Sequence, residues 1–260
     1  MNPITSLLEK IQNGKSLDFG DIFGASIDLF KKTWLQGFIL IILTLVVVIP
    51  LIIALYAPLI GLIMSQGQEG LVDDDAMLSF FGGMSLLYSL LVIIGFFVVG
   101  AVYFALNAGF YRIMRKLDAN ENTVIKDYFY FFKLSYLSKG MIITLISMLI
   151  GIVSLMLCYI PFIYAIVPLS FFAVIFAFNP ELSATEIIKA SFKLANKYWL
   201  VSFGLIVVSS ILSQLVGYLA CGIGLLFTAS FIYHPIYLIY KNVIGFNEVN
   251  AIDEIGVSDY

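Results

Sequence analysis

Apolar residues along this chain collect in long uncharged stretches instead of alternating with polar ones. Four stretches contain no Asp, Glu, Lys or Arg: residues 38–64, 84–111, 140–180 and 198–240. A helix needs about 20 apolar residues to cross the hydrocarbon core of a bilayer. The first two stretches therefore predict one transmembrane helix each, and the last two are long enough to predict a hairpin of two helices each.

Local breaks divide the two longer stretches. Pro161 follows Cys158 closely in the third stretch, and proline lacks an amide proton and disfavours helix at the preceding residue. Gly217, Gly222 and Gly224 break the fourth stretch. The predicted fold class is all-α, a polytopic integral membrane helical bundle with six spans, at about 38–58, 85–110, 140–158, 161–179, 199–217 and 221–240.

One segment of the chain occurs twice. Residues 18–41 align with residues 183–206 without a gap, at the constant offset that separates Trp34 from Trp199. Each copy has the pattern of a charged amphipathic helix, then an interfacial tryptophan anchor, then a span. We predict a single membrane domain, residues 1–260, with parallel repeat units at 18–111 and 183–241, a middle hairpin unit at 122–179 and a cytoplasmic tail at 242–260.

Both copies begin with the same helix-capping signal. Ser183 and Glu186 form a capping box, and Asp18 and Asp21 occupy the equivalent positions. The aromatic segment 122–139 precedes the third span and predicts a third surface helix. We expect these helices to anchor the bundle, or alternatively to offer a cytoplasmic docking face for a partner protein through Lys189, Lys193 and Lys197.

Charged residues are distributed asymmetrically about the predicted spans. An even number of spans places both termini on one side, and all 14 Lys and Arg residues then fall on that side. The opposite side holds Glu69, Asp73, Asp74 and Asp75. The positive-inside rule therefore predicts that both termini are cytoplasmic.

The composition agrees with a membrane protein. Hydrophobic residues make up 61% of the chain and charged residues 12%, against about a quarter charged in soluble domains. The net charge of −3, without a basic run, argues against a nucleic-acid partner. The expected partners are membrane lipids, a protein at the cytoplasmic face, or further copies of the chain.

The sequence offers little catalytic chemistry. His234, the only histidine, lies in the last predicted span beside Pro235. Catalysis or metal binding there would require a carboxylate or a second histidine, which the predicted spans do not supply. We therefore expect no enzyme activity, no cofactor and no metal site, and a helix-packing role for His234.

Uncharged polar residues in the spans are the remaining candidates for a site. Ser210, Ser213 and Gln214 share a helical stripe, and with His234 they form a possible polar intramembrane stripe; Asn107 lies in the second span. Helix packing is the favoured interpretation, and a polar site for a lipid headgroup or small solute is the alternative.

The outer ends of the hairpins carry two further features. Cys158 and Cys221 both lie there, where an oxidising compartment would permit a disulfide; two free thiols are the alternative. Residues 73–75 are three consecutive aspartates. A hard cation prefers six or more oxygen ligands, so this loop is predicted to be solvated.

The segment NPELSATEIIKASFKLANKYWLVSFGL, with its A-S-x-x-L-x-x-K-x-W core, resembles an uncharacterised family of six-span bacterial inner-membrane proteins. This family includes YciC-like proteins and the membrane domain attached to some glycerophosphodiester phosphodiesterases. The resemblance implies a location in the bacterial cytoplasmic membrane and transfers no catalytic residue. We predict an accessory or scaffold protein of the cell envelope; the alternative is a channel or a transporter for a lipid or small solute.

Overall fold

The computed structural model describes residues 3–65, 86–157 and 160–246 of the 260-residue chain. Its elements, in order, are α1 (Pro3–Asn13), α2 (Phe19–Ser65), α4 (Leu86–Asp118), η1 (Ile125–Phe132), α5 (Leu134–Met156), α6 (Ile160–Phe178), α7 (Ala184–Lys197), α8 (Trp199–Leu219), α9 (Leu225–Thr228), η2 (Ala229–Ile232) and α10 (Tyr233–Val243). The described part of the chain contains no strand. The predicted all-α class is therefore confirmed.

Five of these helices are long and apolar enough to cross a membrane. The qualifying segments are Phe19–Pro58, Tyr88–Asp118, Leu134–Met156, Ile160–Phe178 and Trp199–Leu219. The predicted sixth span, 221–240, is helical from Leu225 onward, but the 3-10 segment η2 divides it into α9 and α10. The structure therefore supports a multi-span membrane protein, and a sixth crossing stays a prediction.

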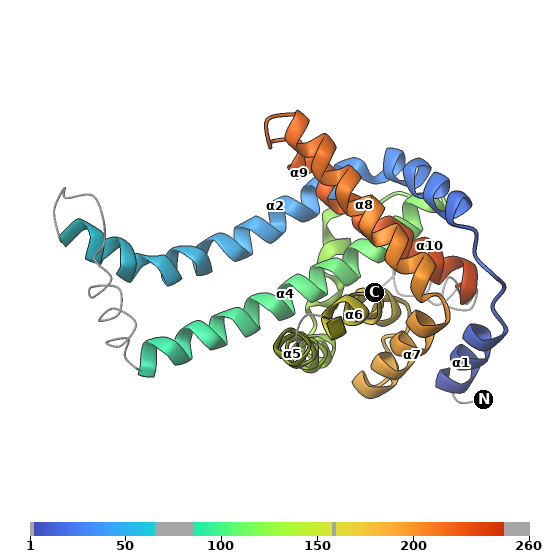
Figure 1. The fold of residues 1–260 in the computed structure, drawn as a ribbon, viewed down its shortest axis with the longest axis horizontal. Coiled ribbons are helices and arrows are strands. Elements are labelled where there is room, and N and C mark those ends of the chain that lie inside the picture. The colour runs from blue at the N-terminus through green and yellow to red at the C-terminus, as the bar shows by residue number, and fades with distance from the viewer. Residues whose placement is uncertain (1–2, 66–85, 158–159, 247–260) are drawn as a thin grey trace, which may run out of the picture.

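The helices diverge from a common end of the molecule. In Figure 1, α2 and α4 run together away from the other helices, α5 and α6 are seen almost end-on, and α8 runs toward the turn at residues 220–224. Both α1 and α7 lie at the opposite end of the molecule from the projecting ends of α2 and α4. Much of the far half of this pair is exposed, including Val46 and Ile93, which are each 64% accessible.

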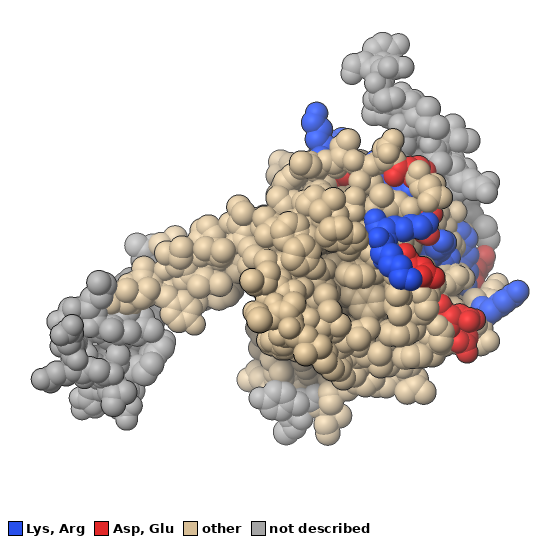
Figure 2. Space-filling model, turned by 90° about the horizontal axis from the view of Figure 1, so that it is seen from above, with Lys and Arg blue, Asp and Glu red and all other residues tan. Residues whose placement is uncertain are grey.

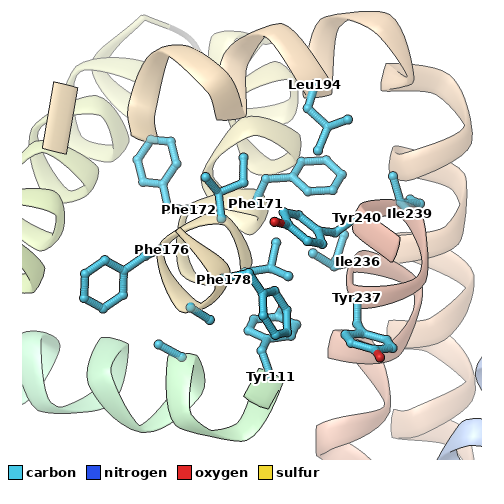
Figure 3. Close-up of a cluster of buried hydrophobic side chains, with 14 of the residues drawn as sticks. Tyr111, Phe171, Phe172, Phe176, Phe178, Leu194, Ile236, Tyr237, Ile239 and Tyr240 are labelled. Atoms are coloured by element: carbon cyan, nitrogen blue, oxygen red, sulfur yellow. The ribbon is translucent and has the colours of Figure 1, made fainter. Parts of the chain in front are cut away.

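Helix α6 is the centre of the core. Figure 3 shows it between α7 and α4, with α10 on one side. Phe171, Phe172 and Phe176 on α6 are at most 1% exposed, and they project in different directions from the helix. Because α6 is apolar on every face, it can be buried by several neighbouring helices at once.

The predicted hairpin breaks are confirmed. Helix α5 ends at Met156 and α6 begins at Ile160, and α8 ends at Leu219 before α9 begins at Leu225. In the second turn, Cys221 and Gly222 have φ values of +56° and +80°. Glycine adopts this left-handed region readily, which explains why the glycine-rich sequence reverses direction here.

Three local features differ from the sequence predictions. Helix α1 is not among the predicted elements, although Ile4, Leu7 and Ile11 bury one of its faces. The aromatic segment 122–139 forms the short 3-10 helix η1 and then the start of α5, instead of one surface helix. In the first copy of the repeated segment, the amphipathic part and the span form one continuous helix of 47 residues, α2, whereas the second copy breaks at Tyr198.

Candidate functional site

Charged side chains gather at the end from which the helices diverge. Figure 2 shows blue and red side chains there and none on the projecting α2–α4 pair in that view. We call this region the polar cap and define it as α1, η1, α7, the start of α5 at residues 134–139, and the ends of α4 and α10 at residues 112–118 and 241–243. Within it, Lys116 pairs with Asp127 at 2.8 Å, and Lys241 pairs with Asp118.

Lysines of the polar cap bind backbone oxygens of other segments. Lys197 Nζ donates to the backbone oxygens of Ile11, Gln12 and Gly14 at 2.9, 2.7 and 2.7 Å, at the end of α1. Lys139 Nζ donates to Leu182 O at 2.6 Å, in the turn between α6 and α7. Helix carboxyl ends carry unpaired carbonyls and partial negative charge, so the Lys197 ammonium group stabilises the end of α1.

The two copies of the repeated segment make equivalent local contacts. Ser26 and Ser191 are fully buried, and their hydroxyls donate to Ile22 O and Ile187 O at 2.7 and 2.8 Å. At the helix starts, Asp18 Oδ1 accepts from Asp21 N at 2.9 Å, and Ser183 Oγ accepts from Glu186 N at 3.3 Å. The predicted capping is thus confirmed in both copies, and Ser183 with Glu186 completes a capping box.

The described hydrogen bonds do not connect the members of the predicted polar stripe to one another. Ser213 Oγ donates to Thr228 O at 2.6 Å, and Thr228 Oγ1 donates back to Ser213 O at 2.8 Å, which joins α8 to α9. Ser210 is half-buried and Gln214 is exposed on α8. Among the described hydrogen bonds, none joins these residues to His234, whose hydrogen-bond partners lie on α2 and η2.

His234 is fully buried and joins α10 to α2. Its Nδ1 faces the backbone oxygens of Ser230 and Phe231 at 3.1 and 3.2 Å, and its Nε2 lies 2.6 Å from Thr33 Oγ1. A nitrogen between two carbonyls must carry the proton, so Nδ1 donates and Nε2 is an acceptor. The single proton of the Thr33 hydroxyl faces both Nε2 and Leu29 O, the latter at 3.0 Å. The predicted helix-packing role therefore agrees with this geometry.

Side-chain donors satisfy carbonyls that prolines leave without an amide partner. Proline removes the donor that would bind the carbonyl four residues earlier. Tyr88 OH donates to Ala54 O, four residues before Pro58, at 2.9 Å. Trp199 Nε1 donates to Tyr164 O, four residues before Pro168, at 3.3 Å. These bonds join α4 to α2 and α8 to α6 beside the two prolines.

The two predicted interfacial tryptophans have different surroundings. Trp199 begins α8 and stacks on Phe203, with the ring centroids 4.8 Å apart. Trp34 lies inside α2, is 45% exposed, and its ring lies 6.2 Å from that of Phe227. The two tryptophans are therefore equivalent in sequence, but Trp34 does not reproduce the hydrogen bond of Trp199 to Tyr164 O.

Two predicted features fall partly or wholly outside the described residues. Cys221 is exposed at the turn after α8, whereas Cys158 lies outside the described residues, so the possible disulfide stays a prediction. Glu69 and the aspartates at 73–75 also lie outside them. Within residues 3–65, 86–157 and 160–246, no group of three or more His, Cys, Asp or Glu residues is placed to hold a metal ion.

The structure also reveals a cavity that the sequence did not predict. It has a volume of about 460 Å³ and lies between α4, α5, α6 and α10, with Asn107, Thr144 and Tyr233 among the residues that line it. Asn107 was recognisable from the sequence as a polar residue within a span. Thr144 was not, because only the packing of α5 against α4 places it beside the cavity.

Comparison of the chain with protein-family models, with curated proteins and with solved structures gave no match.

Proposed function

We propose that this chain is a non-catalytic accessory or scaffold protein of the bacterial cytoplasmic membrane. In this proposal it has six spans and cytoplasmic termini, and the repeated segments lie parallel. The observation that supports it best is the polar cap. Its lysines tie helix ends together through bonds such as those of Lys197 and Lys139, so one end of the molecule forms a fixed base from which apolar helices diverge.

Helix α7 offers the surface through which the base would contact a cytoplasmic partner. Lys189 is exposed and Lys193 lies one turn further along the same face. Lys197, in contrast, is bound to the end of α1. The proposed docking surface therefore consists of Lys189 and Lys193, and Lys197 belongs to the structural framework.

Reporter fusions test the membrane placement. Fusions after Arg115 and Lys189 should both report a cytoplasmic position, and a fusion at the turn near Gly222 should report the outside. A reporter placing Arg115 and Lys189 on opposite faces would contradict the six-span arrangement.

Complementation of a deletion strain tests the docking role. The double substitution Lys189→Glu and Lys193→Glu should leave membrane insertion intact and abolish complementation, whereas Lys126→Glu, at an exposed position on η1, should complement. If the double variant complements as well as the wild type, α7 is not a docking surface. Native mass spectrometry in lipid nanodiscs then reports whether the chain assembles with copies of itself.

The alternative function is a channel, or a transporter for a lipid or small solute. The feature that favours it is a cavity, not the predicted polar stripe. Ser213 and His234 are engaged in helix contacts, but the cavity beside Asn107 and Thr144 is lined by uncharged side chains and lies between candidate spans.

A further inference from the structure

The cavity between α4, α5, α6 and α10 contains polar atoms without partners. Asn107 is 3% exposed and Thr144 is 7% exposed, and neither Asn107 Oδ1 nor Thr144 Oγ1 has a hydrogen-bond partner among the described residues. Both residues line the cavity. Buried polar atoms are nearly always hydrogen-bonded in folded proteins, so these two atoms point to a bound group that supplies the missing bonds.

The orientation of the Asn107 amide defines what that group must offer. Asn107 Nδ2 donates to Tyr103 O at 2.8 Å. Rotating the amide by half a turn would bring its oxygen against this carbonyl, so the atom left over is the acceptor Oδ1. A ligand must therefore present a donor to Asn107, and the Thr144 hydroxyl can then either donate to it or accept from it.

The cavity adjoins an apolar one. A second cavity of about 290 Å³ is lined by Val48, Leu51, Ile52 and Leu55 of α2 and by Phe96 and Val99 of α4, among others. Both cavities are lined by Gly100, Tyr103 and Met148. Water does not suit the second cavity, because apolar cavities stay dry.

Gly100 lies at the junction of the two cavities. A Cβ atom at this position would come within 2.9 Å of Thr144 Cγ2 and 3.0 Å of Met148 Cε. A larger residue would therefore crowd the wall that the two cavities share. The arrangement suits a molecule with a small polar head and a long apolar chain.

The head of this molecule must be uncharged. Among the described residues, no Lys, Arg, Asp, Glu or His lines either cavity. A buried phosphate without a cation is strongly disfavoured, and it would also place negative charge against the Asn107 oxygen. A hydroxyl group meets the requirements, since it donates to Asn107 Oδ1 and exchanges a second bond with Thr144.

We propose that the cavity binds one neutral lipid with a free hydroxyl head, of the diacylglycerol type. The hydroxyl contacts Asn107 and Thr144, and one acyl chain lies in the apolar cavity along α2 and α4. Asn107 precedes Arg112 by five residues, or about 7 Å along a helix, so the head would lie close to the polar cap. This inference needs only the membrane placement of the proposed function and is independent of the docking role of α7.

Competitive binding tests the proposal on the full chain. The purified protein in detergent micelles is mixed with equimolar dioleoylglycerol and dioleoyl phosphatidate, which share their acyl chains and differ by the phosphate, and is then examined by native mass spectrometry. We expect one bound dioleoylglycerol, retained at least roughly tenfold better than phosphatidate.

Three variants identify the site. Asn107→Leu combined with Thr144→Val should reduce dioleoylglycerol retention roughly tenfold, since two hydrogen bonds are lost. Ala173→Leu narrows the cavity without removing a polar group and should reduce retention. The matched control is Thr44→Val, because the Thr44 hydroxyl donates to Leu40 O within its own helix and Thr44 lines neither cavity.

Each unfavourable outcome is decisive. Equal retention of the two lipids, or retention of neither by the wild type, overturns the proposal. Unchanged retention in both the double variant and Ala173→Leu shows that the lipid binds elsewhere and also overturns it. A wrong membrane placement would be seen separately in the reporter fusions, so the two failures can be distinguished.

Discussion

Single lysine side chains hold distant helix ends together in the polar cap. Lys197 Nζ binds three backbone oxygens at the end of α1, although 183 residues or more separate them in the chain. A charged hydrogen bond of this kind contributes about 1.5–3 kcal/mol. The residue therefore contributes to the position of the whole N-terminal helix.

Replacement of Lys197 should release α1. We expect Lys197→Met to increase amide hydrogen exchange in α1 at least roughly tenfold, because the carbonyls at its end lose their shared donor. Lys193→Met, on the same helix, is the control and should leave α1 unchanged. Equal exchange in all three proteins would show that the apolar contacts of Ile4, Leu7 and Ile11 alone fix α1.

The capping box of α7 should depend on pH. The Ser183 hydroxyl and backbone amide donate to the Glu186 carboxylate and lower the pKa of Glu186. Because the folded pKa lies below the ordinary value of 4.5, this stabilisation is present above that value and is lost as the pH falls through the lowered pKa. We expect protection factors of the first-turn amides of α7 to fall below about pH 4.5.

Two variants separate this effect from general acid denaturation. Glu186→Gln cannot ionise, so its protection should not show the same pH-dependent loss. Ser183→Ala should lower protection at every pH, by about 1 kcal/mol, because the backbone loses its cap. If the amide protection of the wild type matches that of Glu186→Gln at all pH values, the Glu186 carboxylate does not cause the pH dependence.

At the scale of helices, a proline is coupled to a donor on a neighbouring helix. Trp199 Nε1 reaches Tyr164 O, which Pro168 leaves without its backbone donor. Trp199→Phe should destabilise the protein by about 1 kcal/mol. In a Pro168→Ala background the same change should cost almost nothing, since the substituted alanine would supply its own amide. Resistance to unfolding in mixed detergent micelles measures all four proteins of this cycle.

The equivalent position in the other copy supplies the control. Trp34→Phe should show no coupling to Pro168→Ala, because Trp34 lies against Phe227 instead of α6. If Trp199→Phe lowers the stability by the same amount in the wild-type and the Pro168→Ala backgrounds, the indole contributes through its stacking on Phe203. Its hydrogen bond to Tyr164 O then contributes nothing measurable.

Helix ends were predictable from the sequence because their causes are local. Pro161 and the glycines around Gly222 act on their own backbone, and Ser183 acts on an amide three residues away. The contacts that position helices relative to one another were not predictable. Lys197 with α1, and Asn107 with Thr144 at the cavity, depend on how separate helices cross. Helix α1 was a missed local signal, since Ile4, Leu7 and Ile11 already have helical spacing.

At the scale of the whole molecule, exposed side chains at the two ends would face different solvents in the proposed membrane placement. Val46 in α2 is 64% exposed and Ile125 in η1 is 65% exposed. In water, these two positions would tolerate a lysine equally well. In the proposed membrane placement, Val46 faces lipid near the middle of the first span, whereas Ile125 faces the cytoplasm.

These two residues therefore form a matched test of the membrane placement. A lysine near the centre of a span costs about 2.5–3.5 kcal/mol on insertion. We expect Val46→Lys to lower the carbonate-resistant membrane fraction strongly and Ile125→Lys to leave it unchanged. Since the two side chains are almost equally exposed, a difference between them reports the surrounding solvent and not a loss of packing. Equal membrane fractions for both variants would place the α2–α4 pair outside the hydrocarbon core.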